Sequence, residues 1–267
     1  MKFKNLGKIL SGLFLVGAVF LALNQAGASE MDDLKKKAQD KYQKFEEQIQ
    51  DLVIVQDFTA SSPTGDVKSI NKQFKKGQKF RIENDMTMPG AGQGMGSLKT
   101  IAVSDGQNAY IFSPFQGKQK LPPEQAKQIS NSAFWWESTL DEGSLAGKET
   151  VDGRDCLILN IKPSEVQPFT KIWLDKDRLV IAKAVGQTPQ GVTVETMFSD
   201  YRAVMGDFEI PYKTASFSEG KPLSTVTVSS VTVNKGLEDD IFDPEKITPP
   251  AAMSMEQLQK MMPPQQN

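Results

Sequence analysis

The chain has 267 residues and no histidine, with 31 Lys+Arg against 33 Asp+Glu and one cysteine, Cys156. Without histidine, Ser-His-Asp and Cys-His nucleophile pairs and His-ligated zinc, copper or haem sites are excluded. A single cysteine excludes an intrachain disulfide and a CxxC redox motif, and the near-neutral charge gives no reason to expect nucleic-acid binding.

Residues 1–28 have the features of a secretory signal peptide. Lys2, Lys4 and Lys8 form a basic start, Leu13–Leu23 is an apolar run, and Ala26–Ala28 fits an A-x-A cleavage site. The run is shorter than the about 20 residues of a membrane-spanning helix, and an uncleaved N-terminal anchor is the alternative. Cleavage would remove three lysines and no acidic residue, changing the formal charge from −2 to −5.

Residues 29–50 predict an amphipathic helix. Apolar residues recur three or four positions apart, which gives one stripe at helical period, and Lys and Glu fill the other face. We expect this helix to dock on the protein's own core, with binding to a membrane surface as the alternative. The stripe consists of Leu34, Ala38, Tyr42, Phe45, Ile49 and Leu52.

Beyond residue 52 the apolar period changes to two, which is typical of strands. Strands are predicted over 52–58 and 73–83, the second segment folding back at Lys76–Gln78. A hairpin is predicted over 101–112, because an Asp-Gly turn between alternating apolar residues is the strongest short hairpin signal.

A Gly-rich segment over residues 86–97 predicts a mobile loop carrying Met86, Met88 and Met95. These methionines are candidate adaptable ligand contacts, since Met is unbranched and polarisable. Plain loop composition is the alternative, and the lack of histidine argues against a copper site.

Pro122 and Pro123 open a predicted helix that extends to about Leu140. Neighbouring helical residues point about 100° apart. Trp135 and Trp136 therefore do not both face one core, and one is expected near a cavity mouth or the surface.

Downstream of residue 151, alternating segments separated by short turns predict an antiparallel meander. In the last segment the apolar phase slips between Val228 and Val231, which predicts a β-bulge near Ser229 and Ser230. The segments are residues 155–161, 170–174, 179–185, 192–201, 209–218 and 223–233.

Some ten strands with few helices predict one curved, incompletely closed sheet covered by helices. Such a sheet leaves an apolar cavity by default. The cavity would suit acyl chains, whose transfer from water is favourable by ~0.8 kcal/mol per buried CH₂. We expect one domain over residues 29–250 and a flexible Pro-, Met- and Gln-rich tail over residues 251–267.

Short motifs follow one another in a fixed order over the chain. They are Phe74–Gly77, Phe80–Glu83, Val103–Gly106 and Tyr110–Phe115, then Trp173–Asp175, Phe198–Arg202, Ile210–Lys213, Val233–Leu237 and Phe242–Pro244. In this order the chain resembles the LolA family of periplasmic lipoprotein carriers, and its second half resembles the broader group of outer-membrane lipoprotein-sorting proteins.

The resemblance implies a mainly β fold, an unclosed antiparallel β-barrel (half-barrel) with a helical lid over a hydrophobic cavity. It also implies a periplasmic, monomeric carrier that takes acyl chains of a lipid or lipoprotein toward the outer membrane, with inner- and outer-membrane proteins as donor and acceptor. Arg81 lies where the family has a lid-latching arginine. A head-group contact or a surface ion pair with Glu83 are the other roles open to Arg81. A lipid-sensing envelope module that does not transport is the alternative function.

Large apolar residues are the candidates to line the cavity, with ordinary core packing as the alternative for each. We predict no catalytic residue, metal or cofactor: Cys156 is expected to be a buried thiol, and Asp175 and Asp177 are expected to be turn formers. A secreted hydrolase is therefore disfavoured. The cavity candidates are Phe112, Phe115, Phe134, Trp136, Trp173 and Phe198.

Overall fold

The computed structural model describes residues 30–62, 65–87, 97–131, 140, 143–163, 169–188 and 190–252. Several sequence predictions lie outside these described residues: the signal peptide, Met88, Met95, Phe134, Trp136 and the tail beyond residue 252.

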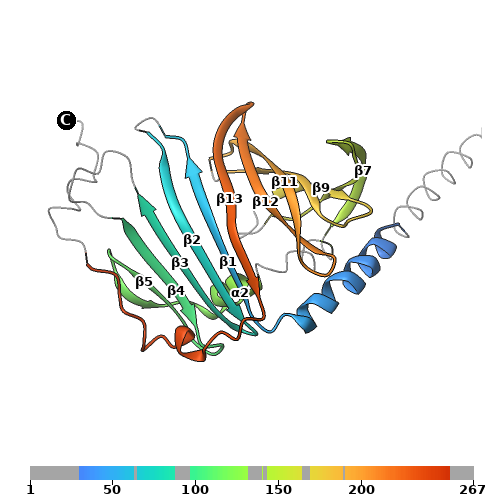
Figure 1. The fold of residues 1–267 in the computed structure, drawn as a ribbon. Coiled ribbons are helices and arrows are strands. Elements are labelled where there is room, and N and C mark those ends of the chain that lie inside the picture. The colour runs from blue at the N-terminus through green and yellow to red at the C-terminus, as the bar shows by residue number, and fades with distance from the viewer. Residues whose placement is uncertain are drawn as a thin grey trace, which may run out of the picture.

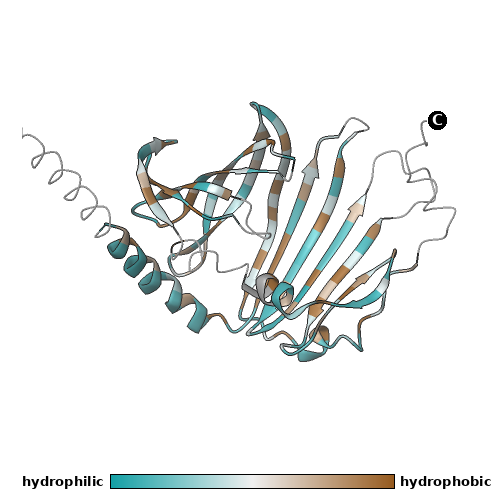
Figure 2. Cartoon of the chain, turned by 180° about the vertical axis from the view of Figure 1, so that it is seen from behind, coloured by the Kyte–Doolittle hydropathy of each residue, from teal (hydrophilic) through white to brown (hydrophobic). Residues whose placement is uncertain are grey.

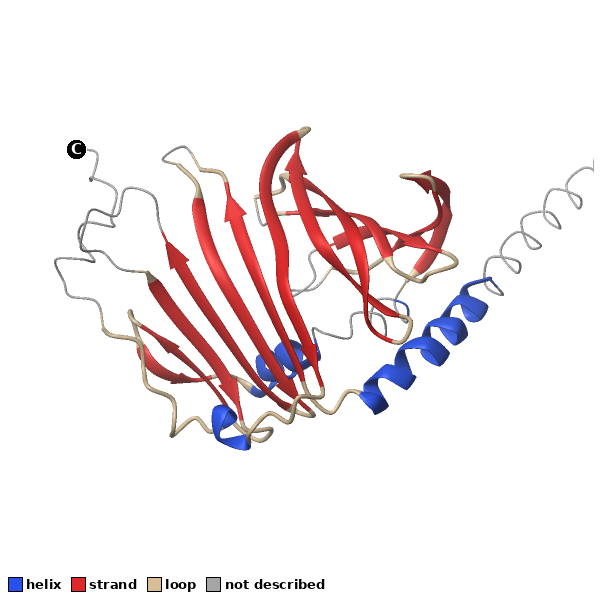
Figure 3. Ribbon diagram, viewed as in Figure 1, coloured by secondary structure: helices blue, strands red, loops and turns tan. Residues whose placement is uncertain are grey.

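Thirteen antiparallel strands form one open sheet (Figures 1 and 3). Two meanders meet where β1 pairs with β13, and β6 and β7 are the free edges. This unclosed, mainly β architecture confirms the predicted fold class. The first meander contains β1 (Leu52–Ala60), β2 (Val67–Lys76), β3 (Lys79–Thr87), β4 (Leu98–Ser104), β5 (Ala109–Ser113) and β6 (Gly117–Lys120).

The second meander runs from the far edge of the sheet back to its centre. It contains β7 (Ser144–Val151), β8 (Arg154–Asn160), β9 (Phe169–Asp175), β10 (Ile181–Gln187), β11 (Thr193–Met205), β12 (Phe208–Ser218) and β13 (Lys221–Val233). The helical elements are an N-terminal helix over residues 30–48, α2 (Pro123–Asn131) and the short 3-10 helix η1 (Asp239–Phe242).

The hairpin turns follow the turn chemistry of the sequence. Between β4 and β5, the Asp105 carboxylate accepts the backbone N–H of Gln107 at 2.8 Å and of Asn108 at 2.7 Å. Gly106 adopts φ +94°, a region that a side chain strongly disfavours. Both features confirm the predicted Asp-Gly hairpin.

A bulge in β13 confirms the predicted slip of its apolar phase. Val55 pairs with Ser230, but the next residue, Gln56, pairs with Val228, so Ser229 is the extra residue. The bulge keeps all four valines of β13 on one face of the sheet, opposite the apolar side of β1.

One face of the sheet can be followed across the molecule, because residues directly opposite on antiparallel strands point the same way. Both helices lie on this face, which we call the helix face. The N-terminal helix packs on it between β8 and β12, and α2 lies behind the strands in Figure 1 and in front of them in Figure 2. The connecting row is Leu159, Ile172, Ala184, Thr196, Ser216, Ser224 and Ala60.

The N-terminal helix forms the main core with the second meander, as its apolar stripe predicts. The Phe45 and Phe208 rings lie 4.9 Å apart, and the Tyr42 hydroxyl donates to the carbonyl of Leu179 at 2.5 Å. Burial raises the pKa of Tyr42. The helix thus buries its stripe within the protein.

A C-terminal strap, residues 239–250, crosses the opposite face, which we call the strap face. Ile247 of the strap is buried against Ile101, Val103 and Phe112. The Asp239 carboxylate lies 2.8 Å from the Lys76 ammonium and 3.0 Å from that of Lys79. Apolar contact and ion pairs together hold the strap on β2–β5.

Three strand segments have no counterpart in the sequence prediction: β6, β7 and the first half of β2. All four residues of β6 are exposed, and β7 alternates weakly and carries a register shift beside Gly147. β6 and β7 are the edge strands and bury too little to show an apolar period, which is why the described residues form thirteen strands rather than some ten.

Candidate functional site

The helix face of the first meander carries two rows of apolar side chains that remain half-buried. The register pairs Val231 with Ile54 and continues, through the polar Gln73 of β2, to Ile82, Ala102 and Ile111. We call this the first apolar row. The second apolar row, nearer the other end of the strands, contains Val226, Phe58, Met86 and Leu98, and Ser69 of β2 lies between Phe58 and Met86.

Charged residues are sorted between the two faces of the same strands. In β1–β5, Lys75 is the one charged residue whose register places it on the helix face. Burying an unpaired charge costs far more than burying an amide or a methylene. This face is therefore suited to apolar contact. The charges on the strap face are Asp57, Lys68, Lys72, Lys76, Lys79, Arg81, Glu83, Asp85 and Lys99.

Lys75 lies on β2, one strand from the junction of the two meanders, between Leu52 and Phe80 in the register. Burial lowers the pKa of Lys75 to about 8, and the nearby Glu46 carboxylate on the N-terminal helix opposes this shift. The low pKa shows how little this part of the helix face favours charge.

The four aromatic candidates within the described residues are not brought together. Phe198 is on the helix face and packs edge-on against Phe169, with ring centroids 6.4 Å apart. Trp173 points to the opposite face, where its indole N–H donates to Glu149 at 2.6 Å. Phe112 is 1% exposed beneath Ile247 of the strap, and Phe115 is 48% exposed in the β5–β6 turn.

Arg81 lies on the strap face, away from both helices. Its guanidinium donates to the backbone carbonyl of Ile241 at 3.1 Å and pairs with Glu83 at 2.6 Å, and Glu83 also contacts Lys99 at 3.0 Å. Burial opposes ionisation of Glu83, but the two cations outweigh it and lower the pKa of Glu83. In the described residues Arg81 therefore holds the strap.

Met86 belongs to the second apolar row and pairs with Leu98 and Ser69. The sequence singled it out as a loop methionine, whereas it lies in β3. The residues that make the two rows, such as Ile54 and Ile82, were not singled out. Their only signal is the period-two alternation, which does not say which phase faces the helices.

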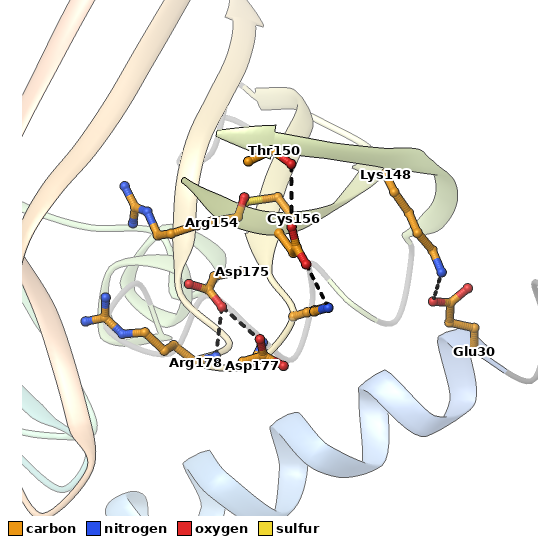
Figure 4. Close-up of polar contacts among 10 residues, drawn as sticks. Glu30, Lys148, Thr150, Arg154, Cys156, Asp175, Asp177 and Arg178 are labelled. Atoms are coloured by element: carbon orange, nitrogen blue, oxygen red, sulfur yellow. Dashed lines mark hydrogen bonds and ion pairs between the residues drawn. The ribbon is translucent and has the colours of Figure 1, made fainter. Parts of the chain in front are cut away.

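Cys156 and Asp175 are buried, one as a thiol and the other as a turn-forming carboxylate. Cys156 is 2% exposed, and burial raises the pKa of its thiol. The Asp175 carboxylate accepts the backbone N–H groups of Asp177 and Arg178 at 3.0 and 2.9 Å, closing the β9–β10 turn (Figure 4). Within the described residues, no three His, Cys, Asp or Glu side chains gather as metal ligands would.

A membrane-spanning helix would need a long apolar stretch. None of the helices in the described part of the chain is both long and apolar enough.

Comparisons with known proteins bear on the fold. No protein-family model matches the chain. An uncharacterised protein from Methanocaldococcus jannaschii is 24% identical over 277 aligned residues, covering all of this chain and 74% of the relative. A LolA superfamily protein from Nitrosomonas europaea matches with a TM-score of 0.51 and 14% identity, over 74% of this chain and 91% of that one.

The chain has a LolA-like fold.

Two further structures agree with the LolA-like fold. A DUF1329 family protein from Desulfovibrio piger matches with a TM-score of 0.57 and 15% identity, over 83% of this chain and 99% of that one. An outer membrane lipoprotein-sorting domain from Vibrio parahaemolyticus matches with a TM-score of 0.55 and 14% identity, over 81% of this chain and 96% of that one. None of these three structures is described by an enzymatic activity.

Proposed function

We propose that this LolA-like protein is a periplasmic, non-catalytic carrier that binds the acyl chains of a lipid or lipoprotein and moves them toward the outer membrane. The observation that carries the proposal is the sorting of charge in β1–β5. The helix face there holds two half-buried apolar rows with Lys75 as its one charged residue. Each methylene placed against this face would contribute ~0.8 kcal/mol.

The carrier would work by enclosure and release. In this proposal α2, which lies on the helix face, covers part of the bound chains, and its displacement exposes them to an acceptor protein. The predicted signal peptide would place the protein in the periplasm, between donor and acceptor membranes. There it would act as a monomer.

The proposal is tested by a matched pair of substitutions on neighbouring strands. Ile82→Asp puts a charge into the first apolar row, and Ile70→Asp makes the same change on the strap face, where Ile70 is 46% exposed. We expect Ile82→Asp to weaken binding of a fluorescent acyl probe at least ten-fold, and Ile70→Asp to leave it unchanged. Mass spectrometry of lipids copurified with the full chain should show the same difference.

Equal probe affinity in the two variants would remove the basis for placing acyl chains on the helix face. Ile82→Asn, which adds polarity without charge, replaces Ile82→Asp if thermal unfolding shows that the aspartate prevents folding. Wild-type protein that copurifies with no lipid and binds no acyl probe would sink the carrier proposal as a whole.

A further inference from the structure

A row of uncharged polar side chains crosses the helix face between the two apolar rows, each of which is interrupted on β2 by one polar residue, Gln73 or Ser69. The register pairs Gln56 with Asn71, Asn71 with Asn84, and Asn84 with Thr100, across β1 to β4. We call these four residues the polar row. With strands about 4.8 Å apart and alternate residues about 6.8 Å apart along a strand, the row is about 14 Å long and about 7 Å from each apolar row.

The polar row has hydrogen-bonding capacity that the protein does not use. The Gln73 amide donates to the Asn71 side-chain oxygen at 2.9 Å. The side chains of Gln56, Asn84 and Thr100 make no hydrogen bond to any other group that the structure describes, and all three are half-buried. Each Asn or Gln amide offers two donors and an acceptor.

Contact with water alone does not explain why the polar row consists of uncharged residues. At the same level of the sheet, the strap face meets water with charged side chains, including Asp57, Lys72, Asp85 and Lys99. The helix face uses amides and a hydroxyl instead. Neutral groups are what a surface requires when it must hydrogen-bond yet be covered by an apolar ligand, since a covered charge would be far costlier.

We propose that the polar row binds the uncharged ester or amide carbonyls of a lipid whose hydrocarbon chains lie along the two apolar rows. This rests on the proposed function and names its ligand class: an uncharged acyl ester or acyl amide. The amide N–H groups donate to the ligand carbonyls. A plain hydrocarbon covering the row would leave these donors unsatisfied, and a free fatty-acid carboxylate would bring a charge to the face.

The test compares two ligands that displace N-phenyl-1-naphthylamine from the full chain: dioctanoylglycerol, which carries ester carbonyls, and hexadecane, which carries none. Asn84→Leu removes amide donors from the middle of the polar row. We expect it to weaken dioctanoylglycerol about ten-fold, which is about 1.4 kcal/mol, and to leave hexadecane unchanged or bound more tightly. Asn84→Ala repeats the test without added bulk.

Lys72→Leu is the control, because it makes a similar polar-to-apolar change next to Asn71 but on the strap face. It should alter neither ligand. If Asn84→Leu and Asn84→Ala change both ligands equally, or change neither, the role of the polar row is overturned while the carrier proposal stands. If neither ligand displaces the probe from the wild-type protein, both proposals fail.

Discussion

The two halves of the helix face use apolar side chains in different ways. In the second meander, Leu159, Ile172, Leu174 and Ala184 are completely buried and lie in the core formed with the N-terminal helix. In the first meander, apolar residues such as Ile54 remain half-buried on a face nearly free of charge. One half of the sheet thus contains the main core, and the other is the half to which the proposed function assigns the ligand.

The largest expected effect on stability comes from replacing one phenylalanine in each half with alanine. Phe45→Ala should lower the free energy of unfolding by about 3–5 kcal/mol, because Phe45 is 4% exposed beneath the turn at Gly206 and against Phe208. Phe58→Ala should cost about 1–2 kcal/mol, since Phe58 is half-buried in the second apolar row. Urea denaturation with unchanged m-values measures both. Equal losses would contradict the division between the halves.

Asp51 joins the two halves and gives the next largest effect. Its carboxylate is 3% exposed and accepts the backbone N–H groups of Lys235, Gly236 and Leu237 at 2.9, 2.8 and 3.2 Å. Hydrogen bonds to a buried charge typically contribute about 1.5–3 kcal/mol. Asp51→Asn should therefore lower the unfolding free energy by about that amount at pH 7, in the same urea experiment.

The pH dependence of this loss has a definite sign. Burial works against ionisation of Asp51, but the three N–H donors outweigh it, so its pKa is lowered in the folded protein. The stabilisation is thus fully present above the unfolded pKa of about 3.9 and disappears as the pH falls through the folded value. The difference in unfolding free energy between wild type and Asp51→Asn should shrink between pH 5 and pH 2. A difference that stays constant over this range would mean that the variant loses packing rather than a charged hydrogen-bond acceptor.

Local features of the fold could be predicted from the sequence because their causes are local. The Asp105-Gly106 turn and the bulge at Ser229 each depend on neighbouring residues only. The pairing of β1 with β13 does not: Leu52 meets Val233 from the far end of the chain. The pattern of residues along one sequence carries no information on such a long-range contact. The sequence therefore predicted a meander but not that the first and second meanders join through β1 and β13.

The candidate site was harder to predict because it depends on which phase of each strand faces the helices. Trp173 and Phe112 were chosen for their size, yet each lies one residue from its helix-face neighbour, Ile172 or Ile111. A shift of one residue moves a side chain to the other face. The distribution of charge distinguishes the two faces of β1–β5 where ring size does not, but it becomes readable only after the register fixes which residues share a face.

Lys75 gives a pH trend at the end of the helix face that lies next to the N-terminal helix. Burial lowers its pKa to about 8, whereas the unfolded chain holds this proton up to about pH 10.4. Stability should therefore rise with pH between these values, because the unfolded state binds more protons there. The Lys75→Met variant has no group that titrates at this position. Its free energy of unfolding, measured by urea denaturation, should therefore exceed that of wild type most below pH 8, and the difference should narrow by pH 10. An advantage that does not narrow would mean that the lysine is not desolvated on the helix face, and that this end of the face is as wet as the strap face.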